Sequence, residues 1–186
     1  MKNRTLQMLV IIFVALLLVG CVNLDKKNAD GSPAWTTEVP HAPGVYYSVG
    51  EARLSSVQTS SIRAEAGARD AIARWASTNV NGAVSTYTEE GGEALRDSQV
   101  LEMLEYLSVQ TVSISLRGVE KEAQWIAEDG TVWVLMSYPV KNLKEAYRLQ
   151  AEALERKLEE KKIDALSSKA MVEFFDSYID SLETNR

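Results

Sequence analysis

The sequence predicts an α+β fold, in which an alanine-rich helix and a second helix pack on a small antiparallel sheet of about three strands, and a long helical extension follows. Three observations predict it. Residues 45–54 alternate with a period of two and are rich in β-formers. Residues 56–88 place alanines at three- and four-residue steps. Asp129-Gly130 is a hairpin signal between two β-rich runs.

The first strand and first helix are expected to pack tightly. Gly50 removes a side chain from one face of the strand, which permits close approach of a helix backbone. Gly67 and Ala68 are expected on the helix face that meets the sheet, and Asn81-Gly82 is a point of interruption. The helix carries one stripe through Ile62, Ala66, Ala73, Ala76 and Val80, and an adjoining one through Ala64, Ala68, Ile72 and Trp75.

Gly91-Gly92 breaks the chain, and a second helix is expected from residue 93 to about 108, through Leu101, Leu104 and Leu107. The stretch 109–116 fits either a longer helix or a strand. The favoured interpretation ends the helix near Val112 and starts a strand near Ser115 that runs to Ala127. After the Asp-Gly turn, residues 131–140 return as a strand, with Val132, Val134, Met136 and Tyr138 on one face.

Residues 141–186 are predicted to be helical, with Asn142 as the cap. Charges interleave four apart up to Lys162, and such pairs contribute only about 0.3–0.5 kcal/mol each. After Ile163 an apolar stripe appears. It is either folded onto the domain's own core or a surface for a second copy or another protein. The candidate interaction residues are Phe174, Phe175, Tyr178, Ile179 and Leu182.

The N-terminus has the pattern of an export signal. Lys2 and Arg4 precede the apolar run 8–19, which is shorter than the roughly 20 residues of a spanning helix. The run ends in Leu18-Val19-Gly20-Cys21, which resembles the lipobox of bacterial lipoprotein precursors. Residues 1–20 are therefore expected to be a signal peptide, cleaved before Cys21, whose thiol carries a covalent lipid.

Residues 21–44 are expected to form a lipidated N-terminus and flexible tether, since they contain Pro33, Pro40 and Pro43 and few apolar positions. Trp35 is the exception and is expected to dock on the domain of residues 45–140. Val22 stands directly after Cys21, in place of the aspartate that commonly retains lipoproteins in the inner membrane. The expected location is therefore the bacterial outer membrane, with the domain in the periplasm or exposed on the surface.

The composition disfavours several functions. The net charge of −6 argues against nucleic acid as a partner. His41, the one histidine, lies in the proline-rich tether, where a fixed general base is not expected. No histidine, cysteine or carboxylate set has metal-ligand spacing, and pairs such as Glu89/Glu90 and Glu159/Glu160 lie in strongly polar stretches. The sequence predicts no catalytic residue, no metal site, and no cofactor other than the lipid on Cys21.

Six segments in order resemble the twenty-kilodalton bacterial lipoprotein family, which includes Helicobacter surface-antigen-like lipoproteins and is related to flagellar basal-disk lipoprotein domains. The resemblance implies an α+β fold with helices on a small antiparallel sheet, and it implies no enzymatic activity. The helical tail from Leu143 departs from it. The segments are Pro33-Ala34-Trp35, residues 47–52, the alanine-rich helix 64–76, residues 116–119, Trp125 and residues 128–135.

The favoured function is that of a non-enzymatic, lipid-anchored envelope protein, which acts as a structural or interaction module through protein partners or self-association. The alternative is a carrier that binds a lipid or small molecule in a helix–sheet crevice. A large apolar cavity would favour the carrier, whereas a filled core with exposed apolar strips would favour assembly.

Overall fold

The computed structural model describes residues 23–90, 95, 98–161 and 167–184. The expected signal peptide, its Leu18–Cys21 box and the lipidation residue Cys21 lie outside these ranges. Among the described residues, no helix combines the length and apolar character needed to cross a membrane.

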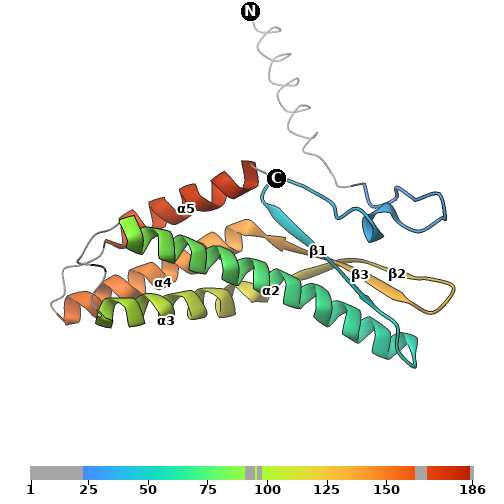
Figure 1. Cartoon of the computed structure of the whole chain (residues 1–186), viewed down its shortest axis with the longest axis horizontal. Helices are drawn as coiled ribbons and strands as arrows, with labels where there is room; N and C mark the ends of the chain where they lie inside the picture. The colour runs from blue at the N-terminus through green and yellow to red at the C-terminus, as the bar shows by residue number, and fades with distance from the viewer. Residues whose placement is uncertain (1–22, 91–94, 96–97, 162–166, 185–186) are drawn as a thin grey trace, which may run out of the picture.

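The molecule is elongated, with a sheet at one end and a helical bundle at the other (Figure 1). Helix α2 (Val57–Glu90) belongs to both ends, because its first half covers the sheet and its second half joins the bundle. The other bundle helices are α3 (Ser98–Ser115), α4 (Val140–Glu160) and α5 (Ser168–Thr184). One core of apolar side chains runs through both ends.

The sheet has three antiparallel strands in the order β1-β3-β2, which agrees with the predicted α+β fold. They are β1 (Val45–Ala52), β2 (Glu120–Ile126) and β3 (Val132–Pro139). The predicted turn at Asp129-Gly130 joins β2 to β3, and Gly130 adopts a φ of 85°, which glycine allows at little cost. As predicted, the alternate residues Val132, Val134, Met136 and Tyr138 of β3 enter the core.

Helix α2 packs directly over β1 at Gly50. A Cβ atom built on Gly50 would lie 1.9 Å from the carbonyl oxygen of Ala64, so a side chain has no room there. The predicted close approach is therefore present. The buried stripe of α2 runs through Ala64, Ala68, Ile72, Ala76, Val80 and Ala83.

Three expectations for α2 are corrected. Ile62 is 65% exposed, because the neighbouring stripe is the one that meets the sheet. A Cβ atom on Gly67 would meet nothing within 4 Å, so Gly67 lies on the helix flank rather than against the sheet. The helix also continues without a break through Asn81-Gly82.

The ambiguous stretch after Leu107 is helical for longer than expected. Helix α3 ends at Ser115, not near Val112, and a short 3-10 turn, η3 (Leu116–Gly118), precedes β2. Thr111 and Ser115 are buried within the helix, and their hydroxyls donate to the carbonyls of Leu107 and Val112. Because each hydroxyl finds its hydrogen-bond acceptor within the same helix, the helix can continue through these buried polar positions.

Helix α4 follows β3 without a loop. It begins at Val140, whose N–H donates to the carbonyl oxygen of Gly44 at 2.9 Å, as an extension of the β1–β3 ladder. Asn142 is therefore inside the helix and is not its cap. A Cβ atom on Gly118 would lie 2.0 Å from the Asn142 amide nitrogen, so this side chain lies against η3.

The segment before β1 is packed on the sheet at one place. Trp35, in the short 3-10 turn η1 (Ala34–Thr36), is 4% exposed, and η1 lies against β3. The turn is held by the Asn28 side chain, whose amide donates to the Ser32 hydroxyl and the Pro33 carbonyl. The expected docking of Trp35 is present.

Candidate functional site

The apolar stripe of α5 packs on the protein's own bundle. Phe175 and Ile179 are fully buried, and Phe174, Tyr178 and Leu182 pack partly buried against the same core. The Phe175 ring stacks on Tyr147 of α4, with centroids 3.9 Å apart and planes at 4°. Of the two alternatives for the candidate interaction residues, the structure therefore has the one in which they dock on self, and Phe175 and Ile179 are not an accessible surface.

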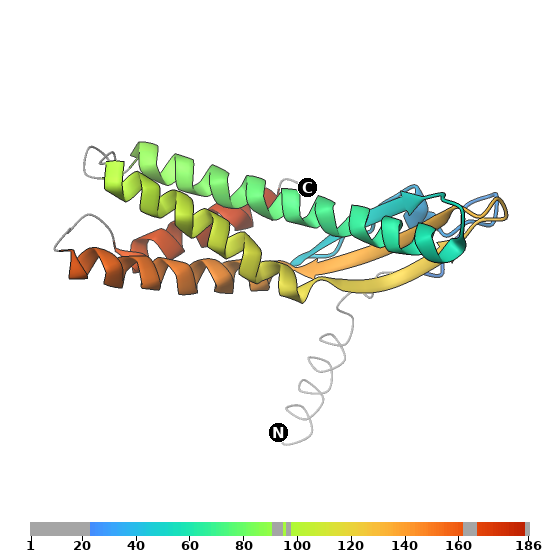
Figure 2. The same cartoon turned by 90° about the horizontal axis from the view of Figure 1, so that it is seen from below.

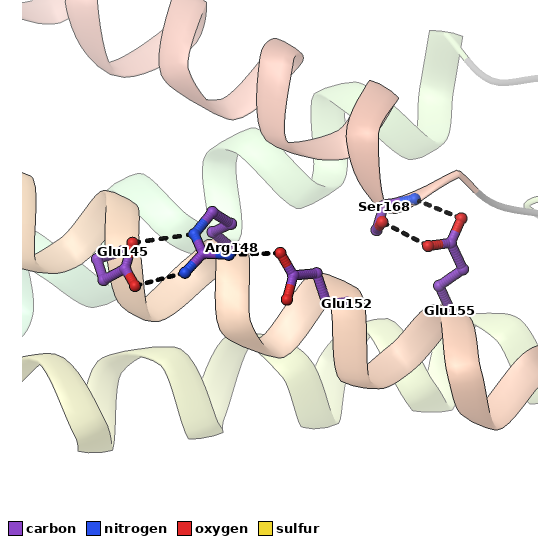
Figure 3. A network of polar contacts seen from close by, with 5 residues as sticks. All are labelled: Glu145, Arg148, Glu152, Glu155 and Ser168. Atoms are coloured by element: carbon purple, nitrogen blue, oxygen red, sulfur yellow. Dashed lines mark hydrogen bonds and ion pairs between the residues drawn. The ribbon is translucent and has the colours of Figure 1, made fainter.

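Polar contacts fasten α5 to α4 on both sides of that stack. The Glu155 carboxylate accepts hydrogen bonds from the Ser168 N–H at 3.1 Å and from its hydroxyl at 2.5 Å, at the first turn of α5 (Figure 3). These bonds hold the pKa of Glu155 below its usual value. Towards the other end of α5, the Lys144 ammonium lies 2.5 Å from the Asp180 carboxylate.

Arg148 links two carboxylates on the exposed side of α4. Its guanidinium contacts Glu145 at 2.6 Å and Glu152 at 2.5 Å (Figure 3). Hydrogen bonds to both carboxylates raise the pKa of Arg148, and its hydrogen bonds lower the pKa of Glu145. Such an exposed network organises the helix surface and supplies no reactive group.

The buried tyrosines are structural. Burial raises the pKa of Tyr138 to about 12 and raises that of Tyr147 further above its usual value. Both rings are fully buried and make aromatic contacts, Tyr138 with Trp75 and Tyr147 with Phe175. Neither hydroxyl is poised to lose a proton near neutral pH.

Three exposed large apolar side chains lie on α3, which was predicted as a helix packed on the core. Leu101 is 41% exposed, Tyr106 54% and Val109 61%. Leu104 and Leu107, by contrast, are buried as predicted. The signal for this second face was present in the sequence, since Tyr106 and Val109 fall outside the stripe that contains the two buried leucines.

A groove of about 480 Å³ lies between α3 and α4 beside Tyr106. The Lys157 ammonium sits 4.9 Å from the centre of the Tyr106 ring, a cation–π contact across the groove. Met103, Leu107, Ala153 and Leu154 supply apolar lining, and Glu102 and Lys161 supply charge. The groove is open to solvent and lies on the outside of the bundle, away from the helix–sheet interface where a carrier was considered.

Within the described ranges, no group of three histidine, cysteine, aspartate or glutamate side chains is arranged to hold a metal ion. His41 is exposed in the segment before β1. The pairs Glu89/Glu90 and Glu159/Glu160 are also exposed at helix ends.

The chain matches no protein-family model, no curated protein and no solved structure.

Proposed function

We propose that the protein is a non-enzymatic lipoprotein of the bacterial envelope, anchored by a lipid on Cys21, that works as an interaction module in a periplasmic, outer-membrane or flagellar assembly. The resemblance to the twenty-kilodalton lipoprotein family supports the proposal on the sequence side, as does the Leu18–Cys21 box behind a charged and apolar leader.

The observation that carries the interaction role is the outer face of α3. Leu101, Tyr106 and Val109 are exposed there. Tyr106 lines the open groove shared with α4, and Leu101 lines a second open groove of about 410 Å³ shared with α2. The core beneath is filled, since Leu104 and Leu107 are buried. A filled core with apolar side chains left on one helix face favours assembly over carriage of a small molecule.

Lipidation is tested first. Radiolabelled fatty acid should enter the wild-type protein and not the Cys21→Ala variant, because the thiol is the group that accepts the lipid. Cleavage before Cys21 should accompany labelling, which mass spectrometry of the purified protein would show. Equal labelling of the two proteins would contradict the proposal.

The role of α3 is tested by charge. Tyr106→Glu and Val109→Glu should remove proteins that copurify with the lipidated wild type, because a desolvated carboxylate opposes docking. Both positions are exposed, so the free energy of unfolding of each variant should differ from that of the wild type by no more than about 0.5 kcal/mol. Ile62→Glu, at an equally exposed position on α2, is the matched control and should leave copurification intact. Loss of partners in all three variants, or in none, would contradict this assignment.

A further inference from the structure

The two edges of the sheet differ in how they are protected. β2 carries Glu120, Lys121 and Glu122 in succession, and its register shifts between Lys121 and Ala123, as at a β-bulge. Charges and bulges are the usual devices that keep an edge strand from pairing with another chain. β1 is regular over its whole length, and Glu51 is its one charged residue.

The hydrogen-bond alternation shows which backbone groups β1 presents outwards. Val140 donates to Gly44, so Gly44 and Val140 are a hydrogen-bonded pair, and every second residue of β1 from there faces β3. The residues between them, Tyr47, Val49 and Glu51, direct their N–H and C=O groups away from the sheet. Among the described residues, these outward groups have no backbone partner. β1 therefore presents an open ladder three residues long.

Beside this edge is a groove of about 640 Å³, between β1, the flank of α2 and the end of α5. Tyr46, Trp75 and Leu182 give it an apolar lining, and Arg74 adds a guanidinium that makes no ion pair with any described residue. One side of α2 faces β2, because Ser61 and Glu65 contact residues of that strand. The opposite side of α2 therefore lies above the β1 edge. Gly67 lies on that flank and leaves it open.

The close packing at Gly50 disfavours a second copy of β1 as the occupant of this edge. Helix α2 lies directly over β1, so two β1 strands paired across a two-fold axis would place two α2 helices over adjacent strands. Adjacent strands are about 4.8 Å apart, whereas packed helices need about 8–10 Å. A single extended chain without a helix above it meets no such obstacle.

We propose that the edge of β1 and its groove bind an extended peptide segment of another envelope protein, which adds a fourth strand to the sheet and places an acidic side chain on Arg74. This site is separate from the outer face of α3, so the inference goes beyond the proposed interaction role and adds a second binding surface. Main-chain hydrogen bonds to Tyr47, Val49 and Glu51 would supply affinity, and the groove would select an apolar and an acidic side chain.

The test uses the full lipidated chain in detergent micelles and a fluorescent peptide of about ten residues, the length of a long strand. The peptide alternates valine with threonine and carries a glutamate near each end. Fluorescence anisotropy should show saturable binding. A second peptide, with glutamine in place of both glutamates, should bind less tightly to the wild type. The Arg74→Gln variant should bind the two peptides with equal affinity.

Proline at outward positions separates the two edges. Val49→Pro removes an outward N–H of β1 and should weaken binding by about tenfold, or 1.4 kcal/mol. Ile126→Pro, outward on β2 by the same alternation, should bind like the wild type. Thermal melting shows whether either variant is folded. A further test changes the peptide and leaves the protein as it is. One peptide is N-methylated on its odd-numbered amides and a second on its even-numbered amides. Methylation of the set that faces β1 should block binding, and methylation of the other set should not.

Three outcomes would overturn the inference: no saturable binding at millimolar peptide, equal binding by Val49→Pro and wild type, or equal binding by both methylated peptides. A wild-type dimer that light scattering shows to be lost in Val49→Pro would assign the edge to a second copy and would also overturn it. If the peptide binds but Cys21 takes up no labelled fatty acid, the lipoprotein proposal is contradicted and the binding site at the β1 edge is still supported.

Discussion

At the scale of single residues, the sequence predicted the structural role of a residue where that residue type fits only one role at its position. Gly50 was predicted to admit a helix backbone, and the Ala64 carbonyl lies where its side chain would be. Gly67 was assigned to the same interface and is not there. A glycine in an alanine-rich helix does not reveal which flank it occupies, because small residues lie on both sides of the buried stripe.

These two glycines give a matched pair of substitutions. Gly50→Ala should destabilise the protein by about 1–3 kcal/mol, since the added carbon overlaps backbone atoms of α2 that cannot move independently. Gly67→Ala should stabilise it by about 0.5–1 kcal/mol, because the site is open and alanine favours a helix. Urea unfolding of both variants measures the difference. Equal midpoints would mean that α2 does not pack on β1 in this way.

The Glu155 carboxylate gives a pH dependence. Its folded pKa is depressed by hydrogen bonds from Ser168, so its contribution is complete above the usual value of 4.5 and is lost as pH falls through the folded value. The attachment of α5 should therefore loosen in acid. The protection of α5 amides against hydrogen exchange, measured relative to the intrinsic exchange rate at each pH, should fall below pH 4.5 in the wild type. Glu155→Gln keeps an acceptor without a charge, so the protection of its α5 amides should depend less on pH; an unchanged profile would contradict the assignment.

At the scale of elements, periodicity identified the helices and strands but not their ends. The prediction stopped the second helix near Val112, because Val112, Ile114 and Leu116 alternate as in a strand. The helix continues to Ser115 because buried hydroxyls such as that of Thr111 bond to the preceding turn. Asn142 failed as a cap for a different reason, since the strand's own ladder supplies the first bond to α4 at Val140.

The apolar stripe of α5 shows what periodicity leaves open. The spacing of Phe174, Tyr178 and Leu182 establishes that one helix face needs cover, but self-docking and partner-docking require the same pattern. Tertiary packing decides between them, through the stack of Phe175 on Tyr147. The exposed face of α3 was missed for a related reason. Tyr106 and Val109 fall outside the stripe of the buried leucines, but the pattern does not show whether a neighbouring element covers them.

At the scale of the whole molecule, α2 is the element that both ends share. Its 34 residues extend from Ala64 over the sheet to Tyr87, which contacts Phe174 of α5 at 5.4 Å between ring centroids. Figure 2 shows this helix running along the full length of the molecule. At about 1.5 Å per residue it is roughly 50 Å long. Because one continuous helix packs against both the sheet and the bundle, a substitution that destabilises the bundle should also destabilise the sheet.

This coupling predicts a single unfolding transition, and the tryptophans make it testable. Trp35, Trp125 and Trp133 belong to the sheet end, and Trp75 contacts Tyr46 of β1, so tryptophan fluorescence reports the sheet. Circular dichroism at 222 nm (roughly the helix band) instead follows total helix. The two signals should give coincident melting curves in the wild type.

Phe175→Ala makes the comparison decisive, because it removes a fully buried ring that packs on Tyr147 in the bundle and belongs to no strand of the sheet. Such a truncation costs about 3–5 kcal/mol. If α2 couples the two ends, tryptophan fluorescence and helical dichroism should shift together to the same lower temperature. Leu149→Ala, on the exposed side of α4, should leave both curves in place. A dichroism transition that moves while the fluorescence transition stays would mean that the bundle and the sheet unfold independently, and that α2 breaks between them.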